Sequence, residues 1–362
     1  MKKFCSTSIT LALCLMGTTA FAANTQVTLV VNEWTGYLSM HSKAIKDHCS
    51  KKGMDIDILV GGPDISDEEN LFNSLRAGVS VKGKDGKLPV DIATPTESFL
   101  KSREGKILKL LAPVDTSKIE GYDKLIPAEL RNSVSHIQDG KHYGVVFMAG
   151  YYGMYYNSAK VKKAPTSWDF LWSDAAKGKY SVSKDTYFVN GHIAQWAIDA
   201  SAKNVKNAYD IDKMDRDKLG QKLEALAQNA KHLWVGIGNS PEQIKDLEYT
   251  VSWGFDLGPE WKLALPAPGS STWVDVLTLT NEAAKDANKL KAFECVSEFA
   301  ITPKAQEIFK EKLRAVPISK DGGLSAAEVK KYFNSDFFWK PLEDRTGNAL
   351  KGLWDRAVAT RK

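Results

Sequence analysis

The segment that follows residue 26 alternates strand and helix patterns, and this order limits the fold more than any other feature. Val27–Val31 is a β-branched run and Met54–Val60 alternates apolar and acidic residues, so both are predicted strands. Leu38–Lys52, between them, predicts a helix. A strand, a helix and a second strand with short links form a parallel sheet that helices cover. The chain therefore starts an α/β lobe here.

The same alternation continues toward the C-terminus. Further strands are predicted at 90–93, 143–147, 179–182, 233–236, 249–253 and 273–279, and further helices at 67–77, 168–176, 190–202, 213–229, 283–300, 303–313, 326–332 and from 342 to the end. With 362 residues, 43% of them hydrophobic, the chain is long enough for two globular units. The aromatic-rich segment Tyr151–Tyr156 marks the first crossing between them.

Two α/β lobes joined by more than one crossing predict a hinged clamp with a ligand cleft between the lobes. We expect residues 23–141 with 270–318 to form lobe 1, and residues 142–269 with 319–362 to form lobe 2.

The N-terminus has the pattern of a secretory signal peptide over residues 1–22. Two lysines precede an apolar run, Ile9–Met16, and small residues follow, ending in Ala20-Phe21-Ala22. The run is too short to span a bilayer. Cys14 as a lipid-modified cysteine is disfavoured because Leu13 precedes it where a small residue is needed.

Removal of residues 1–22 leaves two cysteines, Cys49 and Cys295, and lowers the formal charge from +5 to +3. An oxidising compartment permits a disulfide between them, and two separate buried thiols are the alternative. Two cysteines alone cannot form a tetrahedral metal site. The small net charge indicates no particular partner class, and nucleic acid is not expected as a partner.

Motifs of catalysis and of metal binding are not found in the sequence. The six histidines form no His-Glu-x-x-His arrangement, and neither a Gly-x-Ser-x-Gly elbow nor a phosphate-binding loop is present. The His48-Cys49 pair lies on a predicted helix without an orienting acid. We therefore expect neither an enzyme nor a protein with a metal or cofactor.

Several of the ten tryptophans stand beside carboxylates near the ends of predicted strands: Glu33-Trp34, Trp253 with Asp256, and Trp273-Val274-Asp275. The strand period of two puts Trp273 and Asp275 on one face. An aromatic ring attracts a cation by about 0.5–2 kcal/mol, and a carboxylate accepts charge-assisted hydrogen bonds from an ammonium group. These pairs predict a site for an alkylammonium ligand. The tryptophans assigned to the core are Trp168, Trp172, Trp196, Trp234 and Trp354.

At these residues the chain resembles the periplasmic spermidine/putrescine-binding proteins, a group of extracellular solute-binding proteins, over nearly all of its mature length. The motifs that carry the resemblance are Val31–Tyr37 (VNEWTGY), Gly153–Asn157 (GMYYN), Thr166–Trp172 (TSWDFLW), the Trp273–Asp275 strand and the helix that starts at Pro303. The resemblance implies a type II periplasmic-binding-protein clamp in the periplasm. It also implies ligand walls from Trp34, Tyr37, Trp253 and Trp273, ammonium acceptors at Asp185 and Asp275, and hydroxyl contacts from Thr96 and Ser98.

The sequence departs from the family pattern at two positions. Gly36 and Phe188 stand where acids are common, which leaves open which amine is bound. Glu33, Glu97 and Asp344 are candidates to replace the missing acids.

Two functions follow from the resemblance, both of them for a monomer. One is delivery of a polyamine to an ABC permease, and the other is a sensor that, loaded with norspermidine or spermidine, regulates a membrane-bound signalling protein. A secreted enzyme is disfavoured because no nucleophile and base pair is readable. A metal ion or an amino acid held by Tyr151 and Tyr152 is a further alternative.

Overall fold

The computed structural model describes residues 24–361, except residues 35, 66, 199–207, 256 and 321–332. The expected signal peptide, the helix expected at 326–332 and Asp256 therefore lie outside the described residues. No helix in the described part of the chain is both long and apolar enough to cross a membrane.

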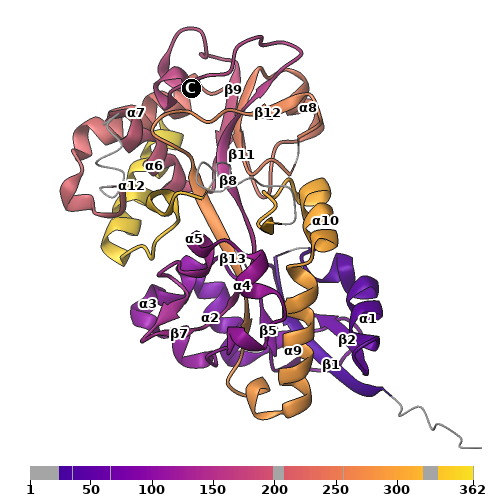
Figure 1. Cartoon of the computed structure of the whole chain (residues 1–362). Helices are drawn as coiled ribbons and strands as arrows, with labels where there is room; N and C mark the ends of the chain where they lie inside the picture. The colour runs from indigo at the N-terminus through magenta and orange to yellow at the C-terminus, as the bar shows by residue number, and fades with distance from the viewer. Residues whose placement is uncertain are drawn as a thin grey trace, which may run out of the picture.

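The molecule consists of two α/β lobes that share one mixed sheet (Figure 1). Among the described residues, this sheet has nine strands in the order β10-β9-β11-β8-β13-β5-β1-β2, with β12 paired to β8. Its strands are β1 (Thr25–Asn32), β2 (Met54–Val60), β5 (Ile92–Ala93), β8 (Val145–Asn157), β9 (Tyr180–Ser183), β10 (His232–Trp234), β11 (Tyr249–Ser252), β12 (Trp261–Leu263) and β13 (Ser271–Leu279). Two short pairs are β3 (Val79–Ser80) with β4 (Lys87–Leu88), and β6 (Ile137–Gln138) with β7 (Lys141–His142). The mixed α/β architecture agrees with the expected clamp.

Lobe 1 is built on the predicted parallel unit. β1 pairs with β2 in parallel, with Val27 opposite Ile56, and with β5 in parallel on its other side. The last four residues of β1 are buried, as expected of a parallel strand that is covered on both faces. Helix α1 (Ser42–Ser50) packs against β2, and helix α9 (Ala287–Ala300) packs against β1.

Strands β8 and β13 cross between the lobes, as Figure 1 shows at the waist of the molecule. The first part of β8 pairs antiparallel with β13, and its second part pairs with β11 and β12. The two expected segments at 143–147 and 151–156 are thus one strand. Gly150 lies opposite Trp273, and a Cβ atom at Gly150 would be 2.3 Å from that indole ring, so a side chain there would displace the ring. The lobe boundaries given above stay a prediction.

The helices cover the outer faces of the two lobes. The remaining ones are α2 (Glu68–Ala77), α3 (Ser102–Gly105), α4 (Tyr122–Leu125), α5 (Ala128–Arg131), α6 (Tyr187–Ile198), α7 (Arg216–Asn229), α8 (Pro241–Lys245), α10 (Pro303–Leu313) and α12 (Asp344–Ala359). Helix α12 packs against α6 and α7, so the C-terminal helix is part of lobe 2.

Three expected helices are interrupted or replaced by 3₁₀ turns. The helix expected at 168–176 is a 3₁₀ helix, Trp168–Trp172. The helix expected at 283–300 is interrupted at Asp286, whose carboxylate caps α9 by accepting from the amides of Asn288 and Lys289. Residues 39–41 form a separate 3₁₀ turn before α1. Trp168, Trp196, Trp234 and Trp354 are buried as expected, and Trp172 is half-buried and packs against the same core.

Cys49 and Cys295 are joined by a disulfide that ties α1 to α9, with the two Cα atoms 5.9 Å apart. The bond closes a separation of 246 residues and is buried. We expect the double variant Cys49→Ser with Cys295→Ser to lose about 2–5 kcal/mol of unfolding free energy, and its Tm to fall by about 5 °C or more. Calorimetric melts of both proteins, with and without dithiothreitol, check this. An unchanged Tm would show that the cross-link does not constrain the unfolded chain.

Candidate functional site

One face of β13 carries the central residues of the candidate site. The strand alternation places Ser271, Trp273 and Asp275 on this face, and each is at most 4% exposed. At about 3.3 Å per residue, Ser271 and Asp275 lie roughly 13 Å apart along the strand. β13 crosses between the lobes (Figure 1), so this line of residues extends from the lobe 2 end of the strand at Ser271 toward the lobe 1 end.

The lobe 1 end of the line is a buried tyrosine and aspartate pair. The Tyr37 hydroxyl donates to Asp275 Oδ2 at 2.7 Å, while Oδ1 accepts no hydrogen bond from the described residues. Burial raises the pKa of Asp275 to about 7, Glu97 adds to this rise, and the hydroxyls of Tyr37 and Thr96 oppose it. Burial beside this carboxyl also raises the pKa of Tyr37. The carboxylate is thus costly to ionise without a cation.

The loop after β5 supplies the next layer around Asp275. Thr96 pairs with Asp275 through an isolated β-bridge and is buried. Glu97 accepts from Ser133 and lies 2.6 Å from His136 Nδ1, so this acid already has partners inside lobe 1. Ser98 is buried, and its carbonyl accepts from the hydroxyl of Ser102 at 3.2 Å.

The loop after β1 places Trp34 half-buried, with no acceptor for its indole N–H among the described residues. Glu33 does not point to a ligand: its Oε2 accepts from the amide of Leu38 at 2.5 Å, and its carboxylate also binds the Ser39 hydroxyl. Burial raises the pKa of Glu33 against these hydrogen bonds. Gly36 has φ of +90°, a conformation that an acidic residue would adopt only with strain. Neither position therefore supplies a ligand carboxylate.

The lobe 2 end of the line is an aromatic cluster. The Trp339 indole donates to Ser271 Oγ at 2.6 Å. Its ring lies 5.7 Å from that of Trp253 and 4.8 Å from that of Phe188, centre to centre. Trp253 also packs against Tyr152 at 4.8 Å. Trp339 was missed by the sequence analysis, although the run Phe337-Phe338-Trp339 just before Pro341 was a readable signal.

Asp185 does not lie with Asp275 at the lobe 1 end of β13. It is exposed, and its Oδ2 accepts from the amide of Gly236 at 2.9 Å. Strand β9, which precedes it, reaches the aromatic cluster, because the Ser183 amide donates to the Tyr152 hydroxyl at 3.0 Å. That hydroxyl donates to Asn190 at 3.1 Å, so Tyr152 is a structural group inside lobe 2. Asp344 lies in the exposed first turn of α12.

One group of metal-ligand type occurs within the described part of the chain: His48, Cys295 and Glu298. Cys295 is in the disulfide and cannot supply a thiolate. The same bond occupies Cys49, so the His48-Cys49 pair has no nucleophilic thiol in this structure.

Solved structures of binding proteins share this fold over nearly the whole chain. The spermidine/putrescine ABC transporter substrate-binding protein of Streptococcus pneumoniae is 18% identical with a TM-score of 0.66, covering 92% of this chain and 99% of its own. The TpPotD lipoprotein of Treponema pallidum is 15% identical, with a TM-score of 0.61 and coverages of 91% and 99%. The apo ferric ion-binding protein A of Pasteurella haemolytica is 16% identical, with a TM-score of 0.56 and coverages of 92% and 97%.

These low identities show the two-lobe fold and not the ligand. The family is shown by the sequence itself, because residues 19–334 match the model of the bacterial extracellular solute-binding proteins. The chain belongs to this family, whose members are binding proteins and not enzymes.

Proposed function

We propose that the protein binds a polyamine between its lobes and presents it to an ABC permease in the membrane. The observation that carries the proposal is Asp275, which is buried on the strand that crosses between the lobes and keeps one oxygen without a hydrogen bond from the described residues. A primary ammonium group would satisfy that oxygen with a charge-assisted hydrogen bond. Such a ligand offsets the cost of burying the carboxylate.

The aromatic residues of the candidate site suit the methylene groups and the second ammonium group of an extended amine. Trp273 and Trp34 present indole rings whose N–H groups have no acceptor among the described residues. At the other end, Trp339 and Trp253 offer ring faces that attract a cation without a carboxylate. Phe188 stands where related proteins commonly have an acid, and it packs on Trp339. At this position the candidate site therefore offers an aromatic ring instead of a carboxylate.

The number of acids distinguishes this site from one with a carboxylate at each end. Glu33 and Glu97 have partners of their own, and Asp185 is exposed. We infer that the ligand is held by one buried ion pair, and that spermidine, norspermidine and putrescine differ mainly in how far they reach into the aromatic cluster. We further propose export through residues 1–22 to the periplasm, and a monomer as the delivering form.

Calorimetric titration of the mature chain tests the proposal. The panel is putrescine, cadaverine, spermidine, norspermidine and spermine, with glycine betaine and arginine as controls. We expect micromolar or tighter binding of at least one polyamine and none of the controls. No heat with any polyamine, or tighter binding of a control, would sink the polyamine assignment and leave the family intact.

A further inference from the structure

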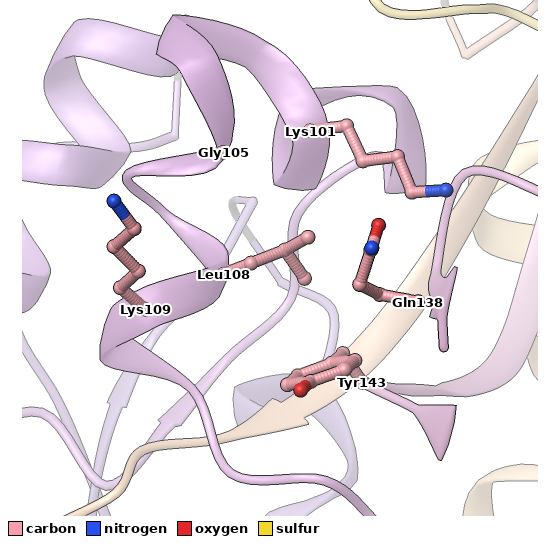
Figure 2. A pocket seen from close by; sticks show the side chains of 6 residues that line it. All are labelled: Lys101, Gly105, Leu108, Lys109, Gln138 and Tyr143. Carbon is pink, nitrogen blue, oxygen red and sulfur yellow. The ribbon is translucent and has the colours of Figure 1, made fainter. Parts of the chain in front are cut away.

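A cavity apart from the candidate site on β13 opens on lobe 1 (Figure 2). It has a volume of about 490 Å³ and is lined by Lys101, Gly105, Leu108, Lys109, Gln138 and Tyr143. Figure 2 shows the Leu108 side chain in the middle, with Lys109 on one side and Lys101 and Gln138 on the other. The cavity thus has an apolar floor between two ammonium groups.

The charge of this cavity favours an anion. None of the six lining side chains is acidic. Lys109 is exposed and forms no ion pair with the described residues. Two ammonium groups, an amide and a phenol around one apolar side chain form a complementary setting for a carboxylate carried on a short aliphatic stem.

The openness of the cavity favours a protein side chain over a free solute. Lys109 and Gln138 are exposed, and the Cβ position of Gly105 has no atom within 4 Å. A small solute in such a hollow stays largely hydrated, whereas solute sites enclose most of their ligand. An aspartate or glutamate projecting from a docked protein is held in place by the rest of its interface and needs no enclosure.

Lys101 links the cavity to residues 133–135, which contact both lobes. Its ammonium group donates to the carbonyl of Val134, a residue that is 69% exposed. The residues on either side of Val134 make contacts in both lobes: Ser133 donates to Glu97 in lobe 1, and the Ser135 hydroxyl lies 3.5 Å from the Trp339 carbonyl in lobe 2. Lys101 therefore holds the loop that joins lobe 1 to the aromatic cluster of lobe 2.

We propose that this cavity receives an acidic side chain of the membrane partner, and that its carboxylate draws Lys101 away from the Val134 carbonyl. Residues 132–135 then lose one of their fixed points, and the contact between Ser135 and Trp339 weakens. Docking of the partner thereby lowers the affinity for the solute, and bound solute lowers the affinity for the partner by the same factor. The docking site rests on family membership and on the cavity, and it does not require the solute to be a polyamine.

Peptide binding tests the docking site directly. The mature protein is titrated at low ionic strength with acetyl-Asp-Glu-Asp-Glu-amide and with its neutral counterpart, acetyl-Asn-Gln-Asn-Gln-amide. We expect the acidic peptide alone to bind, and its affinity to fall about tenfold or more in Lys101→Met with Lys109→Met. Lys84→Met with Lys87→Met, which removes two exposed lysines of the same lobe and so the same net charge, is the matched control and keeps full affinity.

Three results would overturn the docking site. These are equal binding of the neutral peptide, an equal loss in the control with Lys84→Met and Lys87→Met, and binding of phosphatidylglycerol vesicles with the same dependence on Lys101 and Lys109. The last result would assign the cavity to the membrane surface.

Solute affinity tests the coupling. We expect a saturating concentration of the acidic peptide to weaken spermidine binding about threefold or more in the wild type, and to leave it unchanged in the variant with Lys101→Met and Lys109→Met. Equal spermidine affinity with and without bound peptide would refute the coupling. If spermidine does not bind at all, the proposed function fails, while the peptide titration still decides the docking site.

Discussion

Replacing Asp275 by asparagine is expected to weaken polyamine binding about a hundredfold, because the ligand ammonium loses a charged acceptor at a buried position. Asparagine keeps the size of the side chain and can still accept from the Tyr37 hydroxyl, which now lies 2.7 Å from Oδ2. The substitution therefore removes the negative charge of the buried Tyr37–Asp275 pair and changes its shape little. Calorimetric titration with spermidine measures the loss.

The control for this substitution is Asp57→Asn, an exposed carboxylate on β2 of the same lobe. It changes the net charge of the protein by the same amount, so a loss through long-range electrostatics alone would occur in both variants. Thermal melts show whether each variant is folded. A folded Asp275→Asn protein with wild-type affinity would remove Asp275 from the site.

Lowering the pH from 8 to 5.5 is expected to weaken polyamine binding about thirtyfold, because a carboxyl with a pKa near 7 changes from mostly ionised to mostly protonated. The neutral acid cannot pair with an ammonium group, and the polyamine stays charged over this range. In the solute-free protein the raised pKa of Asp275 makes the free energy of unfolding fall as the pH rises, whereas polyamine affinity rises. The stability it contributes is present below the unfolded pKa of Asp and is lost as the pH rises through about 7.

Two variants isolate this titration from that of other groups. Asp275→Asn should bind weakly and almost independently of pH. Tyr37→Phe removes a hydroxyl that lowers the pKa of Asp275, so the midpoint of the affinity change should move to higher pH. Spermidine titrations at half-unit steps of pH give both curves. A wild-type affinity that is constant between pH 5.5 and 8 contradicts the assignment of Asp275 as the ion-pairing group.

Local patterns predicted the bounds of a helix or strand correctly where a single sequence signal marks its ends. β2 and α10 have the predicted bounds, because a strict strand alternation and a proline at the first helical turn mark their ends. The pattern was wrong where a side chain competes with the helix. Asp286 ends one segment and caps the next, and this depends on whether its carboxylate finds the following amides.

For the candidate site, the sequence indicated residue types, and the structure adds the hydrogen-bond partners of those residues. The sequence places Trp273 and Asp275 on one face, and the structure adds Tyr37 from 238 residues away as the hydrogen-bond donor. Glu33 and Glu97 were candidate ligand acids, but each is bound within lobe 1. Trp339 entered the site only through its hydrogen bond to Ser271, which joins segments 68 residues apart.

The sequence by itself determined the α/β class, because periodicity is a local property, and it predicted the two-lobe division and a cationic ligand from local residue chemistry. Only the tertiary structure decided which carboxylate is left without a partner. Whether a buried acid is satisfied depends on donors that approach from distant segments, and no local pattern records that approach. Glu33 and Asp275 show the difference: both are buried acids beside a tryptophan position, yet only Asp275 retains an oxygen without a hydrogen bond from the described residues.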